Sequence, residues 1–126
     1  MDKISNIITK IQNANKAGKQ SVFIPASNLN ESILGLMKRN GFISDFSRKE
    51  KSREIKVVLA YDGGLPKIEG VRRVSKPSQR VYIRASDIRR VKQGYGKVAV
   101  STPRGIMTGE DARKERLGGE PLFEIW

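Results

Sequence analysis

The sequence predicts a mixed α/β protein of the α+β type, with two small lobes in 126 residues. Two segments place apolar residues at helical spacing, and several others alternate apolar with polar residues as strands do. A run of turn-forming residues at 75–79 interrupts this pattern, so we place the boundary between lobes 1–74 and 75–126 there. The N-terminal lobe is expected to contain a helix, a strand, a second helix and antiparallel strands. The C-terminal lobe is expected to be mostly β with one short helix.

The first predicted helix carries isoleucines at positions 4, 7, 8 and 11, which form one apolar stripe. A short strand is expected from Ser21 to Pro25, where proline ends it. The second helix is expected to begin near Asn28, because Asn28-x-x-Glu31 resembles a capping box. Gly41 provides a left-handed residue at its end. The apolar stripe of this helix consists of Leu29, Ile33, Leu36 and Met37.

Three further strands, 42–46, 54–61 and 67–74, are expected to form an antiparallel set in the N-terminal lobe. The basic stretch 48–53 is a hairpin connection, and Asp62-Gly63-Gly64 is a turn.

The expected C-terminal elements are a strand at 80–84, a helical turn at 86–92, a strand at 97–100, a short helix and a strand at 122–126. Thr108 is expected to cap the helix in a Thr108-x-x-Asp111 arrangement. The helix then runs to Leu117 and stops at Gly118.

The net charge of +12 and the pI of about 10.3 favour a polyanionic partner, most often nucleic acid. Residues 67–116 hold 14 basic and 5 acidic side chains, so the second lobe is the expected electrostatic footprint. A solvated basic face is the alternative. Histidine and cysteine are both absent, which removes the usual general base and transition-metal ligands. An enzyme acting on an anionic substrate is the rival class, and the acidic pair Glu110-Asp111 is explained by its place at a helix start.

Ser101-Thr102 and Gly105 form the first candidate site. A hydroxyl pair at a strand end can bond a base edge or a ribose hydroxyl, and a nearby glycine allows close approach. The alternative is a turn in which the hydroxyls cap local backbone groups. The second candidate is Gly118-Gly119-Glu120, where the carboxylate either accepts from a base or pairs with Arg113 or Arg116.

Tyr82 lies between Arg80 and Arg84, and on a strand these three side chains share one face. An aromatic ring between guanidinium groups suits base stacking with phosphate neutralisation. The alternative is a ring packed at the lobe interface. The pair Arg72-Arg73 and the cluster Ser86-x-x-Arg89-Arg90-x-Lys92 add affinity without reading sequence.

Several blocks carry a family resemblance. In order, they are residues 4–14, 24–27, 36–43, 73–77, 80–82, Gly94-Tyr95-Gly96, Val100-Ser101-Thr102, Gly105-Ile106-Met107-Thr108, Ala112-Arg113 and Gly118-Gly119-Glu120. Over nearly its whole length the chain resembles the bacterial-type small-subunit ribosomal protein S8 (uS8) family. It departs from the family pattern at Pro103, at Ser78 and in its final residues, Phe123-Glu124-Ile125-Trp126.

The resemblance implies a structural protein of the small subunit, without a cofactor, that binds an irregular helix in the central domain of 16S-type rRNA. As a primary binder it helps to assemble the platform. A distorted internal loop of the RNA exposes base edges that a regular A-form groove hides. The implied RNA-binding residues are Ser101, Thr102, Gly105, Gly118, Gly119, Glu120, Tyr82, Arg80, Arg84, Arg72, Arg73 and Lys76.

The resemblance also implies further partners. Neighbouring small-subunit proteins are one class. The messenger of its own operon is another, because mimicry of the rRNA site makes such a protein a translational repressor. The expected location is the cytoplasmic ribosome or an organellar one, with no membrane partner.

Overall fold

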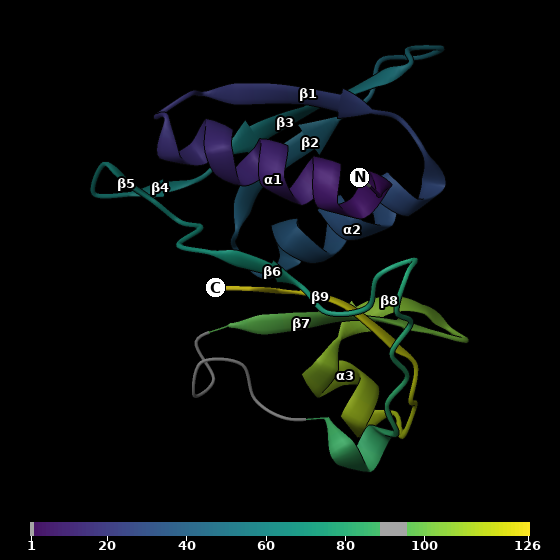
Figure 1. The fold of residues 1–126 in the computed structure, drawn as a ribbon. Coiled ribbons are helices and arrows are strands. Elements are labelled where there is room, and N and C mark those ends of the chain that lie inside the picture. The colour runs from purple at the N-terminus through teal and green to yellow at the C-terminus, as the bar shows by residue number, and fades with distance from the viewer. Residues whose placement is uncertain (1, 89–95) are drawn as a thin grey trace. The chain divides into compact units, whose positions relative to one another are not determined.

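A computed structural model describes residues 2–88 and 96–126 (Figure 1). Residues 3–69 form one compact unit, and residues 70–126, together with Asp2, form another. The two small lobes expected from the sequence, 1–74 and 75–126, stay a prediction. Among the described helices, none is long and apolar enough to cross a membrane.

The N-terminal unit has the predicted helix, strand and helix, followed by antiparallel strands. Its elements are α1 (Lys3–Lys16), β1 (Ser21–Pro25), α2 (Asn28–Arg39), β2 (Ile43–Ser47), β3 (Glu54–Leu59), β4 (Tyr61–Asp62) and β5 (Leu65–Pro66). The three longer strands form an antiparallel sheet in the order β1-β3-β2. The short strands β4 and β5 pair across the predicted Gly63-Gly64 turn, where both glycines have positive φ.

The core of this unit is built from the predicted helical stripes and the inward residues of the sheet. Ile7, Ile8 and Ile11 of α1 are buried, as are Ile33, Leu36 and Met37 of α2. The polar side chain of Asn15 is also buried, and both its amide nitrogen and its oxygen are hydrogen-bonded. It donates to the Ala60 carbonyl at 3.1 Å and accepts from the Ile68 amide at 3.0 Å. This residue therefore ties α1 to the chain that leaves β3.

The helix α2 begins at Asn28, as predicted, but its N-cap differs from the predicted one. Ser27, and not Asn28, is the N-cap: its side chain accepts from the Asn30 amide at 3.0 Å. Leu29 was expected in the apolar stripe but is exposed, and Asn30 is buried instead, donating to the Pro25 carbonyl at 2.7 Å. The N-cap therefore lies one residue earlier than the capping pattern indicated. Its end is as predicted, with Gly41 at φ +80°.

The C-terminal unit is mostly β with one short α-helix, as predicted. Its elements are β6 (Val71–Arg73), the 3-10 helix η1 (Ala85–Asp87), β7 (Lys97–Thr102), β8 (Gly105–Thr108), α3 (Gly109–Lys114) and β9 (Glu120–Ile125). The four strands form an antiparallel sheet in the order β6-β9-β7-β8. A buried cluster of Ile88, Val98, Val100 and Ala112 joins the residue that follows η1, and α3, to β7.

Two strand predictions are corrected. The strand expected at 67–74 covers only Val71–Arg73, and it pairs with β9 instead of joining the N-terminal sheet. The strand expected at 80–84 does not form, and a single bridge between Ile83 and Gly119 fixes that segment. An alternating pattern gives the period of a strand but does not identify its partner, which explains both errors.

The short helix α3 begins as predicted, with Thr108 accepting from the Asp111 amide at 3.2 Å. It ends earlier than predicted. Arg116 takes the left-handed conformation at φ +57°, and the Leu117 amide donates to the Ala112 carbonyl at 2.8 Å. This is a Schellman ending with arginine in the position that glycine usually fills. Gly118 is therefore not the residue that caps this helix.

Candidate nucleic-acid interface

The Ser101-Thr102 pair lies at the end of β7, where the chain turns through Pro103 and Arg104 into β8. The Thr102 hydroxyl is committed to this turn: it donates to the Gly105 carbonyl at 2.7 Å and accepts from the Arg104 amide at 3.2 Å. The local capping alternative is therefore correct for Thr102, which is also buried. Gly105 completes the turn at φ +112°, a conformation that favours glycine.

Ser101 differs from its neighbour. It is half-buried on an inner strand and is paired with Glu120 on β9 and Ile106 on β8. Throughout residues 2–88 and 96–126, no group bonds to its hydroxyl. Of the two predicted hydroxyls, that of Ser101 is therefore the one left to bond a ligand.

The glycine pair packs against protein atoms on two sides. A Cβ atom at Gly119 would lie 2.1 Å from the Ser101 carbonyl oxygen, and one at Gly118 would lie 2.5 Å from the Ile83 carbonyl oxygen. Real Cβ atoms do not approach so closely, and backbone atoms cannot swing aside as a flexible side chain can. Both positions therefore require glycine for packing, and the pair holds the segment at Ile83 beside the end of β7.

Tyr82 is brought to this end of the sheet by the same glycines. The Ile83 amide donates to the Gly119 carbonyl at 2.9 Å, and the Gly119 amide donates back at 3.0 Å. Tyr82 precedes this bridge and the residue is 72% exposed, so its ring is open to a stacking partner. The predicted face shared by Tyr82, Arg80 and Arg84 depended on a strand at 80–84. That strand does not form.

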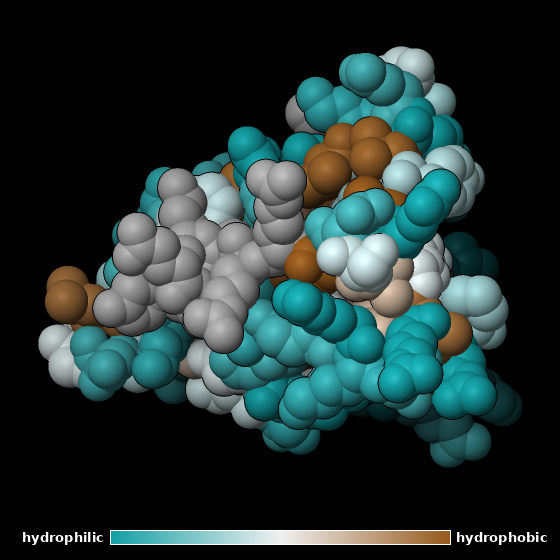
Figure 2. All heavy atoms as spheres, turned by 90° about the horizontal axis from the view of Figure 1, so that it is seen from below, coloured by the Kyte–Doolittle hydropathy of each residue, from teal (hydrophilic) through white to brown (hydrophobic). Residues whose placement is uncertain are grey.

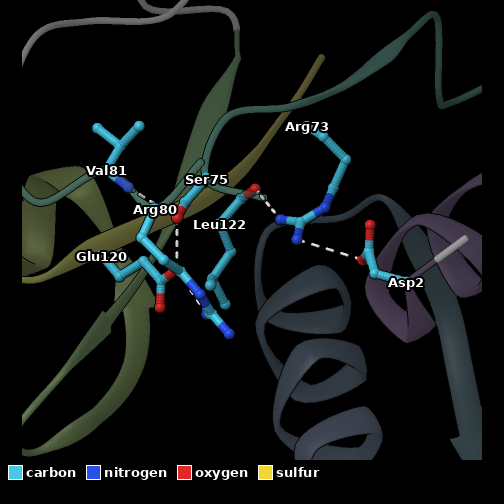
Figure 3. A network of polar contacts seen from close by, with 7 residues as sticks. All are labelled: Asp2, Arg73, Ser75, Arg80, Val81, Glu120 and Leu122. Carbon is cyan, nitrogen blue, oxygen red and sulfur yellow. Dashed lines mark hydrogen bonds and ion pairs between the residues drawn. The ribbon is translucent and has the colours of Figure 1, made fainter. Parts of the chain in front are cut away.

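The Glu120 carboxylate is hydrogen-bonded to two side chains of its own unit (Figure 3). It accepts from the Ser75 hydroxyl and from Arg80 Nη1, the latter at 2.9 Å. Of the two alternatives for Glu120, the ion pair is present, but its partner is Arg80 and not Arg113 or Arg116. Burial raises the pKa of Glu120. The hydrogen bonds from Ser75 and Arg80, and the charges of Arg80 and Arg73, outweigh that effect and lower the pKa overall.

The predicted phosphate-binding cations fall into two groups. Arg72, Arg73 and Arg80 are each ion-paired, with Glu124, Asp2 and Glu120 respectively. Arg73 is the most enclosed, with its side chain 10% exposed, and it also donates to the Leu122 carbonyl (Figure 3). Lys76 and Arg84 are exposed and have no carboxylate within 4 Å among the described residues. These two are the cations most open to a phosphate.

The comparisons with known proteins agree with one another. A family model described as ribosomal protein S8 matches residues 2–126. The small ribosomal subunit protein uS8 of Nitratidesulfovibrio vulgaris (strain DSM 19637 / Miyazaki F) is 42% identical over 125 residues, covering 99% of this chain and 98% of that protein. The protein of the same name from Aster yellows witches'-broom phytoplasma is 44% identical over 126 residues, covering 99% and 97%. The chain belongs to the ribosomal protein S8 family.

Membership in the S8 family makes this chain a small-subunit ribosomal protein, a structural constituent of the ribosome and not an enzyme. In this member Pro103 occupies the exposed β7–β8 turn, where the following Arg104 amide makes the bond to Thr102. Proline has no amide hydrogen, so position 103 offers a ligand neither a hydroxyl nor a backbone donor.

Sequence reasoning missed Ser75, which is fully buried and links Glu120 to the amide of Val81 at 3.0 Å. It stands in the segment of turn-forming residues, and a serine in such a segment gives no signal of burial. Of the predicted basic cluster, Ser86 lies in η1, and Arg89, Arg90 and Lys92 lie outside the described residues. Gly94 and Tyr95 lie outside them as well.

The surface in Figure 2 is mostly hydrophilic, with smaller hydrophobic areas between the polar side chains.

Proposed function

We propose that the C-terminal unit binds an irregular helix in the central domain of 16S-type rRNA directly, and that it does so as a primary assembly protein of the platform. The observation that carries this proposal is the Ser101 hydroxyl at the end of β7, to which no group bonds among residues 2–88 and 96–126. The exposed Tyr82 precedes the bridge between Ile83 and Gly119, and Gly119 packs against the Ser101 carbonyl. A hydroxyl reads a base edge or ribose hydroxyl, and an aromatic ring stacks on an unpaired base.

Residues of the predicted site have different roles in this proposal. Ser101 and Tyr82 contact nucleotides, while Lys76 and Arg84 neutralise phosphates together with the exposed guanidinium groups of Arg72 and Arg80. Thr102, Gly105, Gly118 and Gly119 shape the turn and the packing that present Ser101. Arg73 is enclosed and acts within the protein.

The same surface serves two RNAs in this proposal. The first is the rRNA site, in the cytoplasmic ribosome or an organellar one, next to other small-subunit proteins. The second is an operon messenger that imitates the rRNA site, which makes the protein a repressor of its own synthesis. One set of contacts serves both, so every variant that weakens one complex is expected to weaken the other.

Ser101→Ala tests the proposal at its central atom. Removing one specific contact costs about 1–3 kcal/mol, so affinity for a central-domain internal-loop fragment is expected to fall at least fivefold. Binding to a fully paired duplex is expected to be unchanged, because phosphates supply that affinity. Fluorescence anisotropy with both RNAs measures the two affinities.

Ser32→Ala, at an exposed serine on α2, is the matched control and is expected to bind both RNAs as the wild type does. Equal losses on the loop fragment and the duplex for Ser101→Ala would show that Ser101 does not read the loop.

A further inference from the structure

Residues 75–81, here called the 75–81 loop, are attached to the sheet by Glu120, the first residue of β9. Ser75, at the start of the loop, donates to the Glu120 carboxylate, and Arg80, near its end, donates to the same oxygen (Figure 3). The Glu120 side chain is only 13% exposed. One enclosed carboxylate oxygen therefore holds the loop at both ends.

Ser75 closes the loop a second time. It is fully buried, and its hydroxyl accepts from the Val81 amide at 3.0 Å while donating to Glu120. The Ser75 amide donates to the Pro121 carbonyl at 3.0 Å, which fixes the start of the loop beside β9. Between these ends, Lys76 and Gln79 exchange two backbone hydrogen bonds, of 3.1 and 3.0 Å.

The charge of Glu120 is paired with that of Arg80. A carboxylate among phosphates disfavours RNA binding unless a cation compensates it, and Arg80 lies 2.9 Å from it. The buried hydroxyl of Ser75 completes the arrangement, so one charge and one hydroxyl fix a loop whose residues 76–80 are all exposed.

We propose that Glu120 is a positioning residue for rRNA binding: through Ser75 and Arg80 it fixes the 75–81 loop, and with it Lys76 and Tyr82, in the shape that the RNA requires. This inference rests on the proposed function. It changes the role expected for Glu120 from a direct RNA contact to an internal anchor. Ser75 becomes part of the binding mechanism although it is buried and does not reach the RNA.

A double-mutant cycle of Glu120→Gln and Ser75→Ala on the full-length chain tests this role. Affinity for the internal-loop fragment is expected to fall about fivefold or more in each single variant and little further in the double variant, because both act through one loop. Amide hydrogen exchange of Val81 in the RNA-free protein is expected to become faster in all three. Glu124→Gln, which removes the other ion-paired glutamate of β9, is the matched control and is expected to leave Val81 exchange unchanged.

Two results would overturn the inference. One is a loss of affinity in Glu120→Gln with none in Ser75→Ala, which would make Glu120 a direct RNA contact. The other is unchanged exchange of Val81 in both single variants. If Glu120→Gln does not fold, Ser75→Ala decides alone, since a buried hydroxyl affects RNA only through the loop. A failure of the proposed function is seen separately, as a wild-type protein that does not prefer the loop fragment over a paired duplex.

Discussion

Among single residues, Gly118 and Gly119 show how close packing positions the candidate site residue Ser101. A helix end needs at most one glycine, so two in succession require another explanation. The structure explains both glycines: the carbonyl oxygens of Ser101 and Ile83 occupy the space that a Cβ atom would take at Gly119 and Gly118 respectively. Arg116 takes the left-handed position at the end of α3, so neither glycine is needed there. The glycines are therefore explained by close packing beside Ser101.

Gly119→Ala is expected to lower the free energy of unfolding by about 2–3 kcal/mol, because the added methyl group must displace backbone atoms of β7. Urea denaturation measures this loss. Gly35→Ala is the matched control: Gly35 is inside α2 and its Cβ would meet only the flexible end of Arg39, at 3.2 Å. That variant is expected to gain up to about 1 kcal/mol from helix propensity. Equal stability of the two variants would contradict the packing explanation.

At the scale of elements, the sequence pattern of α2 predicted the existence and the end of the helix but not its N-cap. The apolar spacing predicted its existence and Gly41 predicted its end. Ser27 and Asn28 are both good capping residues, and the sequence does not say which of them adopts the extended conformation. In the structure Ser27 does, at φ −162° and ψ 161°.

Ser27→Ala is expected to lower the free energy of unfolding by about 1 kcal/mol, because the Asn30 amide loses its acceptor. Asn28→Ala is the matched control, since Asn28 is exposed at the first position of the helix, and it is expected to change stability by less than about 0.5 kcal/mol. Thermal denaturation of both variants decides between the two caps. A larger loss of stability for Asn28→Ala than for Ser27→Ala would show that Asn28 is the N-cap, as the sequence pattern indicated.

The sheets show the limit of prediction more clearly. Local alternation predicted β7, and the Gly63-Gly64 pair predicted the turn between β4 and β5. The partner of Val71–Arg73 is β9, more than 45 residues later in the chain. A local pattern of alternation cannot identify a partner strand that is so distant in sequence. The same holds for the candidate site: Ser101 and Tyr82 were identified from residue types, whereas the link from Glu120 to Ser75 depends on contacts 45 residues apart.

For the whole molecule, two carboxylates with lowered pKa values make the stability of the fold depend on acid pH. The pKa of Glu120 is lowered below its ordinary value of 4.5 in the folded protein. Its contribution to stability is therefore complete above pH 4.5 and is lost as the pH falls through the lowered value. The Lys38 hydrogen bond, followed by the Phe46 amide, likewise lowers the pKa of Asp45, so both carboxylates destabilise the fold when acid protonates them.

The variant Glu120→Gln isolates the pH dependence of stability that arises in the C-terminal unit. Its stability deficit against the wild type is expected to be largest near neutral pH and to shrink as the pH falls below about 4.5, because the wild type loses the same charge there. Urea midpoints measured from about pH 7 to about pH 3 test this expectation. A deficit that stays constant with pH would mean that the ionised carboxylate does not stabilise the fold.

The central claim, that this S8-family protein recognises its rRNA by shape and base contacts at the C-terminal unit, is tested most directly with the wild-type protein. Its affinity for an internal-loop fragment of the central domain is compared with that for a fully paired duplex, at low and at high salt. We predict a strong preference for the loop that persists at high salt, since hydroxyl and stacking contacts release no counterions. Equal binding to both RNAs that disappears with salt would show that charge alone accounts for the affinity and would contradict the claim.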